Sequence, residues 1–361
     1  MKALFLGDVC PTAVTAPLFR QKQVDRLFTD TRTLFDESDF CFVNLECAIT
    51  ERDCAIEKFG PALRAPLETA QVLRELGVNC CGLSNNHFFD FGKKGAADSF
   101  AALDAAGIAY TGFGANDTEA RRNFYIDQNG ERIAVIAVCE HEYSYALPDR
   151  MGSRAFDEFE TIEDIRAARA EADRVIVIYH GGKEHSAYPS PRLHRACHAM
   201  ARAGADMILC QHSHCIGCYE QYENCHILYG QGNFHFVKES KNAGWYTSLA
   251  VCYDTVSGEI SFIPVRAHAD HIVLCKGKDA DAVLAAFHAR NRTLLDGTWR
   301  DGWHSFCLGV SELYTQVVSK AYTEDASERA NNKFGHFLDC EAHTDVWREL
   351  FPTANLTNEK E

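Results

Sequence analysis

Short apolar runs recur through the first two thirds of the chain, and glycine or polar residues bound each of them. Runs of this length and setting are typical of buried strands. We expect strands at 3–6, 40–43, 80–83, 133–138, 175–179, 207–210 and 227–229, and a strand that runs into a glycine-rich turn within 108–114. Stretches with apolar residues at helical spacing lie between several of these runs. This alternation predicts a sheet flanked by helices.

The helical spacing also predicts where each helix lies. Helices are expected at 17–35, 67–76, 94–106, 162–172 and 191–203. Gly77, Gly107 and Gly204 follow three of them, as is usual for a glycine that ends a helix. The pair Asn129-Gly130 predicts a hairpin that joins 124–126 to 133–138.

The last third of the chain changes character. Strands at 245–253 and 259–265 are expected to pair around Ser257-Gly258, and from about residue 279 the pattern becomes helical. The expected helices are 283–295, 303–322 and 326–351, followed by a polar tail, 355–361, that should fray. We therefore predict a domain over residues 1–270 and a helical C-terminal extension over 271–361 packed on it.

Side chains that can bind metals follow five of the predicted strands. They are Asp8, Glu46, Asn86 with His87, His180, and His212 with His214. In open α/β sheets, ligands collect at the carboxyl ends of the strands. Oxygen and imidazole donors in this mixture suit Zn, Mn or Fe. The sequence therefore predicts a metal site at one edge of the sheet.

Composition narrows the classes of partner and compartment. The formal net charge of −15 disfavours nucleic acid and anionic membrane surfaces as partners. No apolar run approaches the roughly 18 residues of a membrane helix, and the N-terminus opens directly into a strand, so we expect no membrane segment and no signal peptide. The 16 cysteines fall inside predicted strands and helices, which favours free thiols in a reducing cytoplasm.

Seven motifs lie in order along residues 1–265. They are Gly7-Asp8-Val9, Asn44-Leu45-Glu46, Ser84-Asn85-Asn86-His87 with Asp90-Phe91-Gly92, His180-Gly181-Gly182-Lys183-Glu184, Gly204-Ala205-Asp206, Gln211-His212-Ser213-His214 and Tyr229-Gly230-Gln231-Gly232-Asn233-Phe234. In order and spacing they resemble the CapA family, whose members are associated with poly-γ-glutamate capsule synthesis. That family in turn resembles the calcineurin-like metallophosphoesterases. The resemblance implies a metallophosphoesterase-like β-sandwich flanked by helices. It does not cover the C-terminal helical extension.

The resemblance also implies a role for each site residue. Two adjacent divalent metals are expected: Asp8 and His214 would hold the first, Asn86, His180 and His212 the second, and Glu46 would bridge them. His87 would be the general acid, with Asp90 orienting its ring. Three positions depart from the phosphoesterase pattern, namely Cys10, Glu46 and Gln211, where histidine, aspartate and glycine are usual.

The resemblance leaves two functions open. The first is a metal-dependent hydrolase of a phosphoester or of a γ-glutamyl polymer or peptide. Lys183 and Glu184 would line its substrate pocket, and Lys183 and Arg64 would pair with a polyanion. The alternative is a non-catalytic, metal-binding accessory subunit that assists a capsule synthase.

Two further patterns are read as structural. His194 and His198 lie four residues apart on a predicted helix, a spacing that can bind metal. They flank the apolar face of that helix and are interpreted as surface residues. Cys215 and Cys218 form a single CxxC without a second pair, so they are interpreted as ordinary core or loop cysteines.

Overall fold

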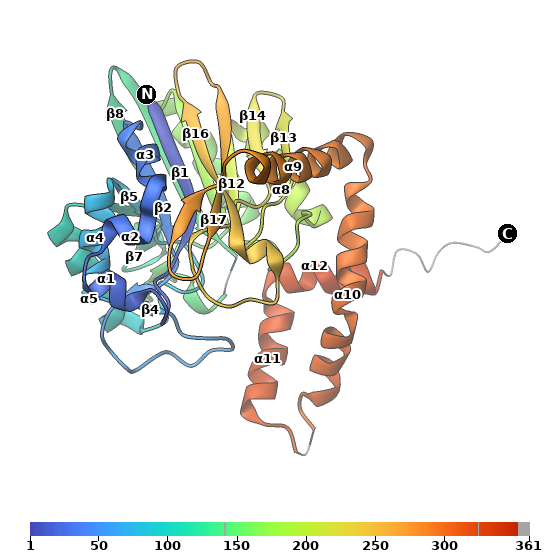
Figure 1. Ribbon diagram of the computed structural model, residues 1–361. Coiled ribbons are helices and arrows are strands. Elements are labelled where there is room, and N and C mark those ends of the chain that lie inside the picture. The colour runs from blue at the N-terminus through green and yellow to red at the C-terminus, as the bar shows by residue number, and fades with distance from the viewer. Residues whose placement is uncertain (141, 324, 353–361) are drawn as a thin grey trace.

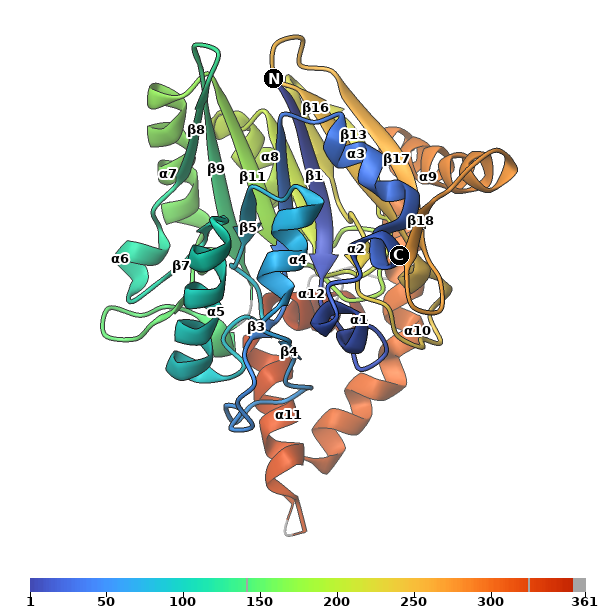
Figure 2. The same ribbon diagram turned by 60° about the vertical axis from the view of Figure 1, so that its left-hand side comes forward.

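The computed structural model describes residues 1–140, 142–323 and 325–352 (Figure 1). Within them, two large sheets lie face to face, with helices on the outer side of each (Figures 1 and 2). The predicted α/β sandwich is thereby confirmed. The predicted fraying of 355–361 falls outside the described residues.

The first sheet is built around β1, which has neighbours on both sides. Its strand order is β18 (Ile272–Leu274), β17 (Ile260–Ala267), β16 (Thr247–Asp254), β1 (Lys2–Val9), β2 (Phe40–Leu45), β5 (Cys80–Gly82) and β6 (Ala109–Thr111), and β15 (Asn233–His235) also pairs with β1. The predicted antiparallel pair is confirmed as β16 and β17. The sequence pattern does not predict β18, which extends this sheet past residue 270.

The second sheet is mostly parallel, with an antiparallel strand at each edge. Its order is β13 (Tyr219–Tyr222), β14 (Cys225–Leu228), β12 (Met207–Gln211), β11 (Arg174–His180), β9 (Glu131–Cys139) and β8 (Phe124–Gln128). The predicted hairpin is β8 with β9. Two short ladders lie outside the sheets, and they pair β3 (Ala48–Ile49) with β4 (Arg64–Ala65), and β7 (Phe113–Gly114) with β10 (Gly152–Ser153).

The central strands bury both of their faces, which is why they appear as continuous apolar runs. In β1, Phe5 packs in the core between the sheets, together with Val135 and Ile178 of the second sheet. Its neighbours Leu4 and Leu6 point the other way, into the core under the outer helices. The two-residue period of a strand therefore supplies both cores from one strand.

Helices cover both outer faces. On the first sheet they are α1 (Ala16–Arg20), α2 (Val24–Phe28), the 3₁₀ turn Thr29–Thr31, α3 (Arg32–Asp36), α4 (Thr69–Leu76) and α5 (Gly92–Ala106), and on the second α7 (Glu158–Glu171) and α8 (Pro191–Ala203). Shorter pieces are α6 (Asp117–Ala120) and the 3₁₀ turns Glu142–Ser144 and Ala243–Tyr246. The single helix predicted at 17–35 is wrong, because Lys22 and Thr29 adopt positive φ angles of 53° and 41° and interrupt it.

The C-terminal region forms four helices: α9 (Lys278–Asp296), α10 (Trp299–Lys320), α11 (Glu328–Asp339) and α12 (Glu341–Leu350). The single helix predicted at 326–351 is wrong, because Cys340 has an extended backbone (φ −81°, ψ 124°) between α11 and α12. The last three helices share a small apolar core that includes Trp303, Tyr314, Phe337 and Val346. None of the described helices is long and apolar enough to cross a membrane.

In Figure 2, the carboxyl end of β1 points towards α12. A buried ion network ties α12 to the second sheet. Arg192 of α8 contacts Glu140, which follows β9, through Nη2, and its Nε lies 3.0 Å from Oδ2 of Asp345 in α12. The Glu140 carboxylate also accepts hydrogen bonds from the Tyr179 hydroxyl and, at 2.6 Å, from the Gly182 N–H. Burial raises the pKa of Asp345 above its ordinary value, and Arg192 offsets only part of that effect. Arg192 thus balances two carboxylates that are out of contact with water.

We predict that Arg192→Ala lowers the free energy of unfolding by about 3 kcal/mol, because it leaves the buried Glu140 without its cation and leaves Asp345 with Arg348, an exposed partner. Urea unfolding followed by circular dichroism measures the change. The matched control is Arg166→Ala, which breaks an exposed pair with Glu163 and should change stability by less than about 0.5 kcal/mol. Equal effects in the two variants would contradict the assigned role of the network.

Candidate metal centre

The structure brings all six predicted metal ligands together at the carboxyl edge of the two sheets. They come from the ends of β1 (Asp8) and β11 (His180), from the residue after β2 (Glu46), from the loop after β5 (Asn86) and from the loop after β12 (His212, His214). Five are buried, and Asn86 is half-buried. Strand register explains the convergence, since Asp8 lies opposite both Asn44 of β2 and Asn233 of β15.

A glycine permits this strand end to close. Gly7 lies beside Gly232, and a Cβ atom at position 7 would be 1.9 Å from the Gly232 carbonyl oxygen. No side chain larger than hydrogen fits there without moving the backbone. Because Gly7 precedes Asp8, this close approach helps to place the aspartate against β15.

Asp8 is a buried carboxylate with several partners. Its Oδ1 accepts a hydrogen bond from the Asn44 amide at 2.8 Å and lies 3.7 Å from His180 Nδ1. Its Oδ2 lies 3.5 Å from His214 Nδ1. Burial alone would raise the pKa of Asp8, but His214, His180 and Asn44 outweigh burial and lower it. Asp8 is therefore held as an anion.

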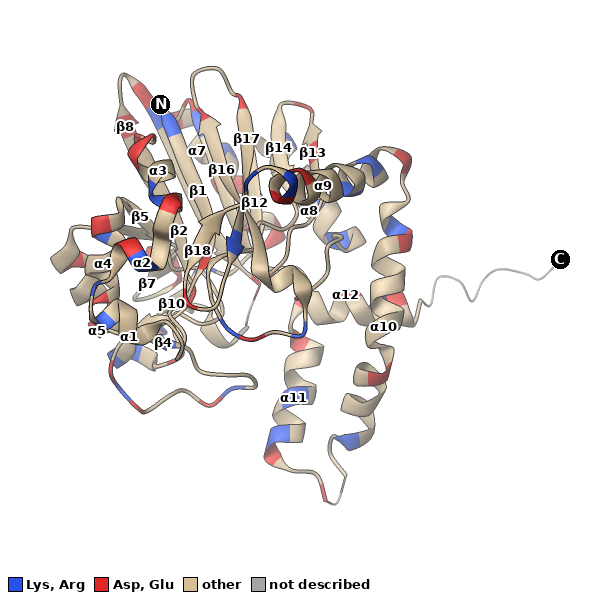
Figure 3. Ribbon diagram, viewed as in Figure 1, with Lys and Arg blue, Asp and Glu red and all other residues tan. Residues whose placement is uncertain are grey.

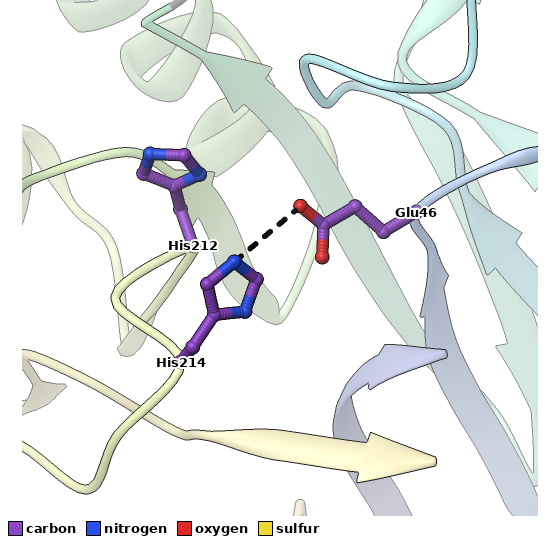
Figure 4. A group of neighbouring side chains, drawn as sticks. All are labelled: Glu46, His212 and His214. Atoms are coloured by element: carbon purple, nitrogen blue, oxygen red, sulfur yellow. Dashed lines mark ion pairs between the residues drawn. The ribbon is translucent and has the colours of Figure 1, made fainter. Parts of the chain in front are cut away.

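Glu46 is also buried, and it faces the same two histidines as Asp8. Neither of its oxygens accepts a hydrogen bond from any residue that the structure describes. Its Oε1 lies 3.5 Å from His180 Nε2 and 3.9 Å from His214 Nε2, beyond ordinary hydrogen-bond length. Burial, reinforced by the charge of Asp8, raises the pKa of Glu46 well above its ordinary value. Figure 4 shows Glu46 extending towards His212 and His214, and the ligand atoms of the three lie within 4.8 Å of one another.

The histidines surround these carboxylates. His180 lies 2.9 Å from the Asn86 side-chain oxygen through Nε2 and 3.1 Å from the Asn44 amide through Nδ1. Burial lowers the pKa of His180 to about 4, so its imidazole is neutral. Burial also lowers the pKa of His212, and the charges of His180 and His214 lower it further.

Among the buried histidines of the site, His87, His180, His212 and His214, the last is the one whose pKa is raised. Its Nδ1 lies 2.8 Å from the Asn233 side-chain oxygen. Burial disfavours its charged form, but Glu46 and Asp8 outweigh burial and raise its pKa to about 9. His212 and His214 also have positive φ angles of 78° and 54°. Such a backbone is strained for residues other than glycine, and strain of this kind concentrates at functional sites.

The general-acid candidate, His87, lies in a three-residue group at the edge of the site. Its Nδ1 is 2.7 Å from Asp90 Oδ2 and 3.2 Å from Lys58 Nζ, and Lys58 also pairs with Asp90. Burial, together with the charge of Lys58, lowers the pKa of His87 to about 4. An ionised Asp90 accepts from Nδ1–H, so the neutral ring keeps its proton on Nδ1. Asp90 further accepts from the Leu63 N–H at 2.7 Å, which fixes the loop before β4.

A cavity of about 250 Å³ opens beside these residues. It is lined by Asn86, His87 and His212 of the site, by Lys58, Phe59, Gly60 and Pro61, by Lys183 and Glu184, by Tyr143, and by Leu313, Lys333, His336, Phe337, Cys340, Ala342 and His343 of the C-terminal region. Helices α10 to α12 thus cover the candidate centre. Figure 1 shows α12 below the ends of the strands and α11 beside the long loop between β3 and β4.

The predicted substrate-binding residues separate into two places. Lys183 and Glu184 line this cavity. Burial raises the pKa of Glu184, but Lys183 and His214 outweigh burial and lower it, so it is an anion. Arg64 lies elsewhere. It borders a different hollow together with Cys10 and Lys238, and its guanidinium pairs with Asp53 at 2.6 Å.

Taken together, these residues fit divalent cations. A buried carboxylate without a hydrogen bond is costly, and Glu46 faces two imidazole nitrogens at separations closer to those of two ligands on one ion than to a hydrogen bond. Metal binding would also displace the proton of His214, because imidazole binds metals in its neutral form.

The sequence pattern does not identify Lys58, Asn44 and Asn233 as residues of the site. Asn44 and Asn233 nevertheless lie inside two of the motifs quoted above.

Comparisons with known proteins agree on one family. Residues 2–238 match the family model described as bacterial capsule synthesis protein PGA_cap. The capsule biosynthesis protein CapA of Bacillus anthracis is 32% identical over 249 residues, which cover 66% of this chain and 59% of that protein. The PGA biosynthesis protein CapA of Bacillus subtilis is 27% identical over 249 residues, which cover 68% of this chain and 64% of that protein. This chain therefore spans less than two thirds of the length of either Bacillus relative.

A third relative matches over a longer part of the chain. A probable polyglutamine synthesis accessory protein of Mycobacterium tuberculosis is 31% identical over 340 residues, covering 90% of this chain and 80% of that protein. Among solved structures, a 5′-nucleotidase precursor from Thermus thermophilus aligns with a TM-score of 0.44 at 13% identity, covering 82% of this chain and 59% of that one. A dimetal phosphatase from Danio rerio aligns with a TM-score of 0.32 at 11% identity, covering 64% of this chain and 94% of that one. Scores below 0.5 support no conclusion about activity.

The variant Glu46→Gln tests this geometry. Without metal, we predict that the variant is more stable than the wild type by about 1–2 kcal/mol, because an amide loses less than a carboxylate when it is buried without hydrogen bonds. With excess Mn²⁺ or Zn²⁺ the order should reverse, because only the wild type gains stability from the bound ion. Urea unfolding in EDTA and in metal measures both states. Glu51→Gln, in an exposed side chain, is the control, and a Glu46→Gln variant that is less stable in both conditions would contradict the interpretation.

Proposed function

The chain belongs to the bacterial capsule synthesis protein family, and on that premise we propose that it is a metal-dependent hydrolase that cleaves a γ-glutamyl amide at the end of an anionic chain. One observation carries the proposal. Five other donor side chains from both sheets gather around Glu46, a buried carboxylate with no hydrogen bond from the described residues. A fold gains nothing in stability from such a group unless a cation binds there. The proposed cofactors are two divalent ions, Mn, Zn or Fe.

The charges that line the cavity support an anionic substrate. Lys58, Lys183 and Lys333 all border it, next to His212. Elsewhere, acidic and basic residues are interspersed along the C-terminal helices (Figure 3). A volume of about 250 Å³ lies below the usual range for ligand pockets, roughly 300–1,000 Å³. It suits a chain end better than the middle of a polymer.

The residues around the cavity have distinct roles in this proposal. The bound cations would supply Lewis acidity and an activated water. Asp90 holds the Nδ1 proton of His87, which leaves Nε2 to accept a proton and return it to the leaving group. Lys58 pairs with Asp90 and ties this loop to the Asn86 carbonyl at 3.1 Å. Lys183 and Lys333 attract the carboxylates of the substrate.

A phosphoester remains the second candidate substrate within the same site, because two-metal centres also stabilise phosphoryl transfer. The other candidate is a non-catalytic accessory subunit of a capsule synthase. Its support is the relative named as an accessory protein, whose match covers 90% of this chain. We also propose a cytoplasmic location. Its support is that the 16 cysteines form no disulfide.

The first experiment compares metal content and turnover. We predict close to two Mn, Zn or Fe ions per chain by elemental analysis, lost in the double variant His212→Ala, His214→Ala. The metal-loaded protein should release glutamate or a shorter oligomer from short γ-glutamyl oligomers. Parallel assays with p-nitrophenyl phosphate and bis(p-nitrophenyl) phosphate test the phosphoester alternative. Bound metal and bound oligomer without turnover of any substrate would favour the accessory subunit. No metal after incubation with Mn²⁺ and Zn²⁺ would remove the hydrolase proposal.

A second prediction concerns Lys58. Lys58→Met should lower kcat on whichever substrate is turned over by about a hundredfold, because it frees Asp90 and the ring of His87, while the metal content stays unchanged. Lys94→Met, in an exposed residue of α5, should leave kcat as in the wild type. An unchanged kcat in Lys58→Met would exclude Lys58 from the site.

A further inference from the structure

A second group of metal-binding side chains lies away from the strand ends. His194 and His198 project from α8, and Glu220 projects from β13. One ligand atom from each lies within 4.8 Å of the other two. The sequence pattern places the two histidines on a helix surface, but it gives no sign that a carboxylate 22 residues later reaches them.

The distances are close to those of a coordinated ion. His194 Nε2 lies 3.4 Å from Glu220 Oε1, and His198 Nε2 lies 2.8 Å from the same oxygen. Ligands about 2.0–2.1 Å from a tetrahedral zinc are roughly 3.3 Å apart. The first pair already has this separation, and the second reaches it with a shift of about 0.5 Å. Without an ion, the same oxygen accepts from Tyr229 at 2.7 Å.

Aromatic neighbours hold both rings in place. His194 stacks on Tyr229 (5.8 Å between centroids, 16°) and on Trp299 (4.8 Å, 19°). His198 stacks on Tyr222 (3.7 Å, 16°). Ligands whose orientation is fixed by packing lose little entropy when they bind an ion, so the site is largely formed in advance.

The site is also open to solvent. The side chains of His194, His198 and Glu220 are 20%, 17% and 16% exposed. An ion can enter, and water can complete its coordination. Two imidazoles and one carboxylate, with a further position open, form a ligand set typical of zinc.

We propose that His194, His198 and Glu220 form a second transition-metal site that binds Zn²⁺. The ion would link α8 to β13 beneath Trp299, the first residue of α10. It would thereby brace the start of the helices that cover the candidate metal centre. In Figure 1, α8, β13 and α9 lie in the same part of the molecule, close to the start of α10.

The test titrates metal-free full-length protein with Zn²⁺ against a chromophoric chelator. The wild type should bind about one equivalent more than Glu220→Gln, which keeps the size of the side chain but removes its charge. Co²⁺ at this site should give the absorption of a tetrahedral ion, and Glu220→Gln should lose it. His304→Ala, which removes a histidine that also pairs with a glutamate, Glu349, should bind as the wild type does.

The double variant His212→Ala, His214→Ala separates this site from the strand-end centre. It should still bind about one Zn²⁺ and unfold at a higher temperature in its presence. Circular dichroism checks that it folds, and the difference between wild type and Glu220→Gln decides the question if it does not. Equal Zn²⁺ binding by wild type and Glu220→Gln would overturn the proposal and leave a hydrogen-bonded surface network.

Discussion

Two carboxylates buried side by side are the constraint on which this structure depends. Asp8 and Glu46 are both removed from water, and the charge of Asp8 adds to burial in raising the pKa of Glu46. The fold satisfies the first with Asn44, His180 and His214 and leaves the second without a hydrogen bond among the described residues. The charges of His214 and Lys238 offset part of that rise in the pKa of Glu46. The centre is thus built for more positive charge than the chain itself provides.

Parallel strands make this arrangement possible. Since β1 and β2 of one sheet and β11 and β12 of the other end at the same edge, side chains far apart in sequence arrive together. The apolar faces of these strands pack in two cores, so the positions of their ends are fixed by many contacts rather than by the site itself. Rigid strands can therefore hold polar groups in an arrangement that is unfavourable on its own.

The sequence predicts the strand ends well for the same reason. A continuous apolar run followed by Asp8 or His180 indicates both a buried strand and a polar group at its end. Lys58 could not be found in this way, because the loop that carries it has no periodicity and reaches Asp90 only through the fold. The amphipathic pattern of α10 to α12 predicts helices with a buried face, but not that they cover the site. The breaks at Lys22, Thr29 and Cys340 depend on local backbone angles, which apolar spacing does not specify.

The cover formed by these helices also addresses a difficulty in the charge of the protein. At a net charge of −15, the molecule as a whole repels an anionic chain. At physiological ionic strength, however, exposed charges are screened beyond about 8 Å. Three lysines around one small cavity therefore matter more to a bound group than the distant acidic surface does. Closing that cavity with helices that contribute Leu313, Phe337 and Ala342 to its wall lowers the local dielectric and strengthens each of these contacts. A polyanion would then be drawn in at its end, where its carboxylates reach the lysines, rather than along its length. If the proposed function holds, the C-terminal helices would have a role in substrate selection that a bare strand-end centre, open to solvent, would lack.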